Sequence, residues 1–229
     1  MLESEKPPAA ALTQAQRRDK ARAAILDATV ALIAELGLAG FTMANVAERA
    51  GYTHGLPGHY YRSKDQLVDA AVAEILCWPV AQNQSEKDGK LAGQKPGLHA
   101  LLESARWSLT AELDDPVKAR AKLVVMTDVH ASSRFGSLIA DYYRRRSATI
   151  TRHLEAGCDV GDIRPLDGEA FAWAVQGMQR GVLLVALCSP QYFERSRLVD
   201  AYIDALQHAL MAYQRPDHPG LLRQKPSVN

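Results

Sequence analysis

The sequence predicts an all-α fold of about nine helices, with a small N-terminal head followed by a larger helical body. Apolar residues recur at spacings of three and four along much of the chain, and no run alternates apolar and polar residues as a strand does. Glycine and proline interrupt this pattern at intervals that suit separate helices. The length of 229 residues accommodates one small and one larger domain.

The chain is expected to begin with a disordered leader over residues 1–15. The first helix is then expected over residues 16–36, because Ile25 and Leu32 lie on one apolar stripe. Gly37 follows as a C-terminal stop. The role expected for this helix is to support the segment that comes after it.

Residues 41–67 are the most informative part of the sequence. Thr42 is placed to cap a short helix, Gly51 can end it in a turn that needs a positive φ, and Thr53 is placed to cap a second short helix. Residues 63–66 form a capping box, in which serine accepts from the glutamine amide and the glutamine side chain returns the bond. Two short helices that meet at a glycine turn predict a helix-turn-helix, whose second helix enters the major groove of DNA.

This segment resembles the N-terminal domain of the tetracycline-repressor (TetR) family. The resemblance rests on the ordered motifs Arg22-Ala-Ala-Ile-Leu-Asp-Ala28, Glu35-Leu-Gly37, Phe41-Thr-Met43, Val46-Ala-Glu-Arg-Ala50-Gly51, Gly55-Leu-Pro-Gly58 and Tyr60-Tyr-x-Ser63-Lys64-Asp65-x-Leu67. It covers about a fifth of the chain. It implies a three-helix DNA-binding domain over residues 16–63 and a helical domain over residues 64–214 that binds an effector and forms a homodimer.

The chain departs from the family pattern at the second short helix. The family usually has Gly-Thr-Leu-Tyr-x-Tyr-Phe where this chain has Gly55-Leu-Pro-Gly-His-Tyr-Tyr61. Gly58 therefore takes the place of a tyrosine that often contacts a phosphate in the family. Because proline is tolerated only near the start of a helix, either the recognition helix begins late or Pro57 lies in its first turn.

The residues expected to contact DNA lie on and around this recognition element. The net charge is only +1, so phosphate binding must depend on local placement. Hydroxyls at helix N-termini, a tyrosine hydroxyl and a lysine suit phosphates, and projecting histidines suit base edges. The expected contacts are Thr42, Thr53, His54, His59, Tyr60 and Lys64. The basic group Arg17, Arg18, Lys20 and Arg22 is either a phosphate clamp or a solvated charge run, and Tyr61 is assigned to packing.

The body is expected to be helical after a loop over residues 82–97, which lack periodicity. Its helices are expected over residues 98–113, 117–132, 135–156, 169–187 and 195–213. Asp115 and Pro116 are predicted to open the second of these as N-cap and first helical residue, and Gly157 is predicted to end the third. A disordered tail is expected over residues 215–229.

The last two helices are predicted to form a homodimer interface. Apolar and small residues surround residues 170–187 on nearly all sides, and the final helix carries a matching stripe, as the resemblance implies for the pair of helices that contact the second copy. The expected interface residues are Trp173, Gly177, Gly181, Val185, Tyr202 and Leu206. The alternative is that these apolar faces belong to the core of a single chain.

An effector pocket among the middle helices is the other feature that the resemblance implies. Pockets are mostly apolar with a few polar groups, and the candidate lining residues are Trp107, Met126, His130, Tyr143, Trp173 and Gln176. For each of them ordinary core packing is the alternative. Arg144, Arg145 and Arg146 are expected to point in three directions along a solvated helix and to form no common clamp.

The function expected from these observations is a cytoplasmic, homodimeric transcription regulator without a cofactor or metal. Its expected partners are a palindromic operator in double-stranded DNA and a small-molecule effector, with no membrane association and with repression more expected than activation. An effector-independent or protein-partnered DNA binder is the first alternative. A helical-bundle enzyme is the second, although the histidines form neither a His-Glu-x-x-His motif nor a Glu-x-x-His pair.

Overall fold

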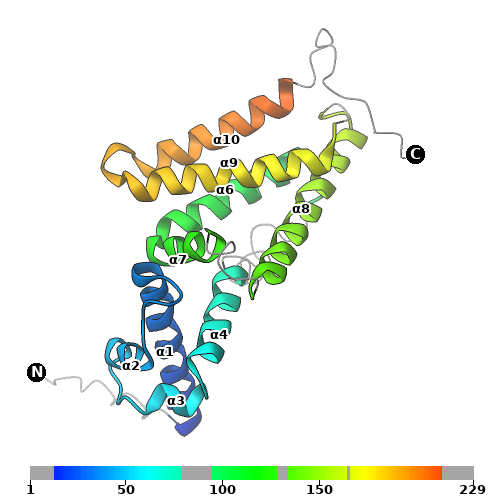
Figure 1. Ribbon diagram of the computed structural model, residues 1–229. Coiled ribbons are helices and arrows are strands. Elements are labelled where there is room, and N and C mark those ends of the chain that lie inside the picture. Colours follow the sequence, from blue (N-terminus) through cyan, green and yellow to red (C-terminus); the bar gives the residue numbers. More distant parts are fainter. Residues whose placement is uncertain (1–12, 79–93, 128–133, 164–165, 213–229) are drawn as a thin grey trace, which may run out of the picture. The chain divides into compact units, whose positions relative to one another are not determined.

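The computed structural model describes residues 13–78, 94–127, 134–163 and 166–212. Nine α-helices and one short 3-10 turn make up these ranges, and no strand occurs within them (Figure 1). The all-α prediction is therefore confirmed. The chain divides into two compact units, Met1–Val72 and Ala73–Asn229, which are called the head and the body below.

The head holds the first helices of the chain. Their bounds are α1 (Gln14–Leu36), α2 (Met43–Ala50), α3 (Leu56–Tyr60) and α4 (Lys64–Cys77). The division between the units falls inside α4, whereas the sequence placed a boundary just before residue 64. Leu67 and Ala71 are fully buried, so the start of α4 belongs to the compact head.

The ends of the first two helices follow from side chains and glycines close to them in sequence. Thr13 caps α1 in a capping box with Gln16, so this helix begins slightly earlier than expected. Gly37 (φ 75°) ends α1 and Gly51 (φ 74°) ends α2, both in the region that glycine adopts readily. The predictions of these two stops are confirmed. Thr42 caps α2 as predicted, and its box partner is Asn45.

A small core and an ion pair hold α1 against α2. Ile25 and Ile33 of α1 are buried together with Phe41 and Val46. At the surface, both terminal nitrogens of Arg49 on α2 donate to the carboxylate of Glu35 on α1 at 2.6 Å. This bidentate geometry fixes the angle of the two helices more tightly than a single contact would.

The body holds the remaining helices. Their bounds are α6 (Leu98–Asp114), α7 (Pro116–Thr127), α8 (Gly136–Asp159), α9 (Gly168–Cys188), the 3-10 turn η3 (Pro190–Tyr192) and α10 (Arg195–Ala212). Pro116 opens α7, and the carboxylate of Asp115 accepts from the amide of Lys118 at 3.0 Å, as predicted. Gly157 was predicted to end α8, but this prediction is wrong, because the helix continues to Asp159. It lies buried within the helix, beside Ile163, and the positive φ occurs at Gly161 instead.

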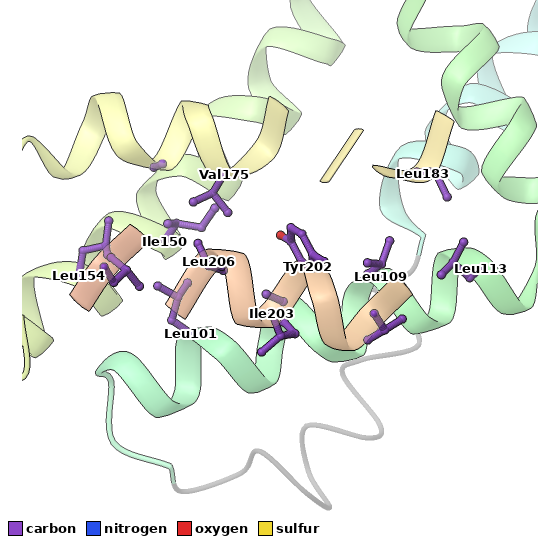
Figure 2. Packing of buried hydrophobic residues seen from close by; sticks show 14 of the residues in the cluster. Leu101, Leu109, Leu113, Ile150, Leu154, Val175, Leu183, Tyr202, Ile203 and Leu206 are labelled. Carbon is purple, nitrogen blue, oxygen red and sulfur yellow. The ribbon is translucent and has the colours of Figure 1, made fainter. Parts of the chain in front are cut away.

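The core of the body lies where α10 packs against α6 and α9. Figure 2 shows Ile203 and Leu206 of α10 beside Leu101 of α6, in a cluster that also includes Val175 of α9. Tyr202 and Leu206 are 2% and 0% exposed. Their predicted place at a dimer interface is therefore wrong for these side chains, because their own chain covers them.

One helix of the described ranges, α9, is long and apolar enough to cross a membrane by length and composition alone. The sequence analysis predicted no membrane association. Core helices of globular proteins meet the same criterion. In this body α6, α8 and α10 all pack against α9, which accounts for the apolar residues that face them.

Candidate functional site

The helix-turn-helix is formed by α2, the turn at Gly51, and α3. The turn is closed by the amide of Tyr52, which donates to the carbonyl of Ala47 at 2.9 Å. The short helix α3 starts at Leu56 and holds Pro57 as its second residue. Of the two alternatives left by the sequence, Pro57 in the first turn is the one observed, because a missing amide proton costs no hydrogen bond there.

Thr53 does not cap α3, contrary to prediction. The residue before α3 is Gly55, whose position has no side-chain cap. The backbone carbonyl of Thr53 instead accepts from the amide of Leu56 at 3.0 Å, which makes Thr53 part of the turn. Its hydroxyl remains exposed, as does the side chain of His54 in the same turn.

A groove in the head brings the end of α3 to the start of α1. It has a volume of about 670 Å³, and it is lined by Gln14, Ala15, Arg18, Asp19, Arg22, His59 and Tyr60. The rings of His59 and Tyr60 meet edge to face, with centroids 5.5 Å apart. Two guanidinium groups against one carboxylate make this groove locally positive although the chain is nearly neutral.

The groove gives Arg18 and Arg22 a common surface with the predicted DNA contacts His59 and Tyr60. A positive surface that carries a phenol hydroxyl and an imidazole can bind phosphate oxygens and reach base edges. From the sequence, Arg18 and Arg22 could be either part of a phosphate clamp or part of a solvated charge run. The missing information was that the start of α1 lies beside the end of α3.

Lys64 is engaged within the head. Its ammonium donates to the carbonyl of Ala39 at 2.9 Å and lies 4.5 Å from the centre of the Phe41 ring. The side chain therefore holds the connection between α1 and α2 in addition to any contact with DNA. The start of α4 also differs in detail from the predicted box, because the side chain of Gln66 accepts from the amide of Arg62 rather than from that of Ser63.

Gly58 is exposed in the middle of α3. A β-carbon built at Gly58 would meet no atom within 4 Å. The position at which the family usually carries tyrosine is therefore open in this head. Tyr61, by contrast, is buried and was correctly assigned to packing.

One face of α9 is apolar and uncovered. Trp173, Leu184 and Val185 are 45%, 51% and 48% exposed, and Gly177 and Gly181 lie on the same side of the helix. A β-carbon at either glycine would meet no atom within 4 Å. Four of the predicted interface residues thus share one exposed face, here called the α9 stripe. Leu184 was missed, although it lies one turn from Gly181.

The predicted pocket residues do not form a single site. Tyr143 of α8 connects Met126 of α7 to Trp173 of α9: its hydroxyl is 3.4 Å from the Met126 sulfur, and its ring centroid is 5.8 Å from that of Trp173. Gln176 is buried, and its amide donates to the Ser147 hydroxyl at 2.8 Å. Trp107 is half-buried on α6, and His130 lies outside the described residues.

A network of polar side chains occupies the interior of the body. It is called the polar cluster and consists of Ser108, Glu112, Lys122, Tyr142, Arg146, Gln179 and Arg180. The carboxylate of Glu112 is 0% exposed and accepts from Lys122 at 2.9 Å, from Arg180 at 3.0 Å and from Gln179 at 2.9 Å. Burial of this carboxylate is tolerated because donors surround it.

Arg146 belongs to the same cluster but bonds to neutral groups. Its guanidinium donates to the Ser108 hydroxyl at 3.1 Å and to the Gln179 side-chain oxygen at 2.6 Å. Arg144 pairs with Asp141 at the surface and Arg145 is exposed. The three arginines do point in different directions, as expected, but Arg146 points inward and was missed. The signal available was the set of isolated polar residues within the apolar helix α9, among them Gln179 and Arg180.

The electrostatic field of the cluster is positive. Burial alone would raise the pKa of Glu112, but Lys122, Arg180 and Arg146 outweigh that effect and lower it to about 2. Burial would likewise raise the pKa of Tyr142, yet the same cations lower it. Two buried acids are therefore both shifted toward their negative forms. The described residues contain no group of His, Cys, Asp and Glu that could hold a metal ion.

Comparisons with known proteins agree with the head geometry. Residues 25–71 match the family described as bacterial regulatory proteins, tetR family. The HTH-type transcriptional regulator BetI of Paraburkholderia xenovorans (strain LB400) is 42% identical over 59 residues, which are 26% of this chain. Because the match spans only 30% of the length of BetI, it concerns the head and not the body.

Solved structures resemble the whole chain in fold. A TetR transcription regulator from Haloarcula marismortui has a TM-score of 0.68 at 18% identity, covering 86% of this chain and 98% of that one. A transcriptional regulator from Saccharomonospora viridis in complex with choline also has a TM-score of 0.68 at 18% identity, covering 83% and 97% of the two chains. The head thus matches the tetR family of bacterial regulatory proteins, and the chain shares its fold with these regulators.

Proposed function

We propose that the protein is a homodimeric repressor that binds a palindromic operator and is released from it by a small-molecule effector. The observation that carries this proposal is the positive head groove next to the recognition helix α3, within the segment that matches the tetR family. A regulator of this kind works on DNA in the cytoplasm. The family comprises regulatory proteins, and enzymatic activity is not part of the proposal.

The groove residues divide into two roles on DNA. Tyr60, Arg18 and Arg22 bind phosphate oxygens, because a phenol hydroxyl and guanidinium groups are donors suited to them. His59 and His54 reach base edges in the major groove, where donor and acceptor patterns distinguish base pairs. Thr42, Thr53 and Lys64 contribute further phosphate contacts around α2, the turn and α4.

The α9 stripe is the proposed surface between the two copies. Large exposed apolar side chains around two glycines allow two α9 helices to approach closely and to remove that surface from water. Two heads held by one dimer would then contact half-sites about one helical turn apart. The two-fold symmetry of the dimer is what makes the operator an inverted repeat, and the distance between the heads sets the spacing of its half-sites.

Release by an effector follows from a population shift. A ligand that binds more tightly to a form of the dimer unsuited to the operator lowers DNA affinity by the difference between its affinities for the two forms. The choline complex of the S. viridis regulator supports a ligand site in a chain of this fold. Release of the bound operator by a small molecule would separate this proposal from an effector-independent regulator.

The test is selection of bound sequences from random duplex DNA at fixed salt, followed by light scattering of the selected complex. We expect an enriched inverted repeat bound by two copies. Tyr60→Phe should weaken binding to that repeat, whereas Tyr192→Phe, an exposed tyrosine of η3 in the body, should not. Enrichment of a single half-site bound by one copy would contradict the dimer, and salt-sensitive binding without enrichment would contradict sequence-specific regulation.

A further inference from the structure

The formal charges of the polar cluster do not balance. Lys122, Arg146 and Arg180 bring three positive charges, and Glu112 brings one negative charge. Lys122 and Arg180 share that carboxylate, while Arg146 has no carboxylate within ion-pair distance among the described residues. Arg146 is partly buried, and its Nε is fully withdrawn from water. A charge in such a position without a counter-charge is unfavourable, so the imbalance requires an explanation.

Several donors of this region lack an acceptor in the described part of the chain. The Nε atoms of Arg146 and Arg180 are buried and make no hydrogen bond. The hydroxyl of Tyr202, on α10, is also buried without a partner, and the side chain is 2% exposed. Tyr202 lies within electrostatic reach of Arg146, Glu112 and Arg180, so its hydroxyl belongs to the same region. Unsatisfied buried donors beside excess positive charge are the complement of an anion.

We propose that the effector is a small organic anion, a carboxylate on an apolar or aromatic body, whose carboxylate is bound by Arg146 and Arg180 of the polar cluster. This inference rests on the proposed effector function. Guanidinium groups match a carboxylate with paired, charge-assisted hydrogen bonds. The apolar body lies against Tyr143 and Met126, where the tyrosine hydroxyl is 3.4 Å from the methionine sulfur.

The same cluster excludes a cationic effector. A quaternary ammonium ion requires free aromatic faces and no competing positive charge. In this body the ammonium of Lys122 already lies 4.9 Å from the ring centre of Tyr142 and 5.7 Å from that of Trp78. The lowered pKa of Tyr142 is consistent with a field that favours negative charge. The choline bound by the S. viridis regulator is thus a ligand of the opposite sign.

The test uses the full chain and matched ligands that differ only in charge. Thermal unfolding and calorimetry would compare octanoate with octanamide, benzoate with benzamide, and choline, all at equal ionic strength. We expect the better carboxylate to bind at least about tenfold more tightly than its amide, the difference that a charge-assisted pair provides. Equal effects of carboxylate, amide and sodium chloride, or no binding of either carboxylate, would overturn the inference.

Two variants on α8 separate ligand binding from a structural role. Arg146→Gln keeps hydrogen-bonding capacity toward Ser108 and Gln179 but removes the unbalanced charge. It should abolish the preference for the carboxylate while leaving the melting temperature of the free protein unchanged or higher. The control Arg145→Gln removes the same charge from an exposed neighbour and should change neither quantity. A large loss of stability in Arg146→Gln with an unchanged carboxylate preference would show that Arg146 is structural.

Measurement of operator binding in parallel distinguishes the two proposals. If a carboxylate binds the body and fails to release DNA, the anion site stands and the proposed effector function fails. If choline or a neutral amide releases DNA while neither carboxylate binds, the effector function stands and the anion site fails.

Discussion

The head and the body both contain arginines, but they place them in opposite environments. Arg18 and Arg22 lie on an exposed groove of the head, where water solvates them. Arg146 and Arg180 are partly buried in the body, with the Arg180 side chain 13% exposed, and their terminal nitrogens donate to side chains of the polar cluster. An arginine in the head therefore loses little solvation free energy on folding, whereas an arginine in the body needs a counter-charge to offset that loss.

The comparison predicts where a charge change affects folding and where it affects binding. Charge changes in the head should alter DNA affinity with little effect on stability, because exposed ions contribute little to folding. Removal of the one buried carboxylate of the polar cluster should lower stability strongly, because two cations share it. Substitutions in both units test this contrast.

The largest effect is expected for Glu112→Gln. This change leaves Lys122 and Arg180 without their shared carboxylate and should lower the free energy of unfolding by about 3–5 kcal/mol, measured by urea denaturation. Asp114→Asn is the control, because the exposed Asp114 pairs with the equally exposed Arg195. Similar losses in both variants would show that burial does not distinguish these ion pairs.

The Glu112 carboxylate also predicts a dependence of stability on acid. Its pKa in the folded protein is lowered from 4.5 to about 2, so the folded state binds fewer protons than the unfolded state between these values. The stabilisation is complete above about pH 4.5 and is lost as the pH falls toward 2. Between pH 4.5 and 2 the free energy of unfolding should fall more steeply with decreasing pH for the natural protein than for Glu112→Gln. An equal pH dependence in both proteins would contradict the lowered pKa of Glu112.

On the α9 stripe a charge should disrupt assembly rather than folding. Leu184→Glu should raise the dissociation constant of the dimer by about a hundredfold or more, because the charge would be buried without a partner. Size-exclusion chromatography with light scattering over a dilution series measures this change. The control is Leu36→Glu in the head, since both leucines are 51% exposed. Dissociation in both variants, or in neither, would place the interface elsewhere.

In the head, His59→Ala should cost about 1–3 kcal/mol of discrimination between the preferred and other base pairs. Tyr60→Phe should instead weaken binding to all sequences by a similar factor and reduce the slope of affinity against salt, because it loses a phosphate contact. Titrations on operator and scrambled duplexes at several salt concentrations separate the two. His99→Ala, an exposed histidine of α6 in the body, serves as the control. Neither head variant should change the unfolding midpoint.

The smallest effect is expected at Gly58. Alanine at this exposed helical position should stabilise the head by about 0.5–1 kcal/mol through helix propensity, since its β-carbon would meet no atom within 4 Å. A thermal unfolding scan measures the gain. Destabilisation would mean that α3 requires the conformational freedom of glycine at this point.

Local signals made the head largely predictable from its sequence. The stops at Gly37 and Gly51 and the cap at Thr42 depend on residues within a few positions of the helix ends, and all three are observed. The prediction that Thr53 caps α3 was wrong, because Pro57 fixes the start of α3 three residues beyond Thr53. The proximity of Arg18 to Tyr60 depends on tertiary packing, which periodicity does not contain.

In the body the same kind of reasoning identified helices but not their neighbours. A stripe such as that of Tyr202 and Leu206 has the same spacing whether it faces its own core or a second copy, and here it faces the core. Likewise, the run of three arginines implies three directions without saying which one points inward. The polar cluster draws residues from four helices, so it exists only once those helices are packed.

The open position in α3 has a consequence for how such a regulator can change over time. A β-carbon added at residue 58 would meet no atom within 4 Å, so a single codon change can introduce a new group at this point of α3 without a clash at its first atom. Most changes to a recognition surface exchange one contact for another and risk stability in doing so. Gly58 offers this lineage a route by which operator preference can diverge without a compensating second mutation.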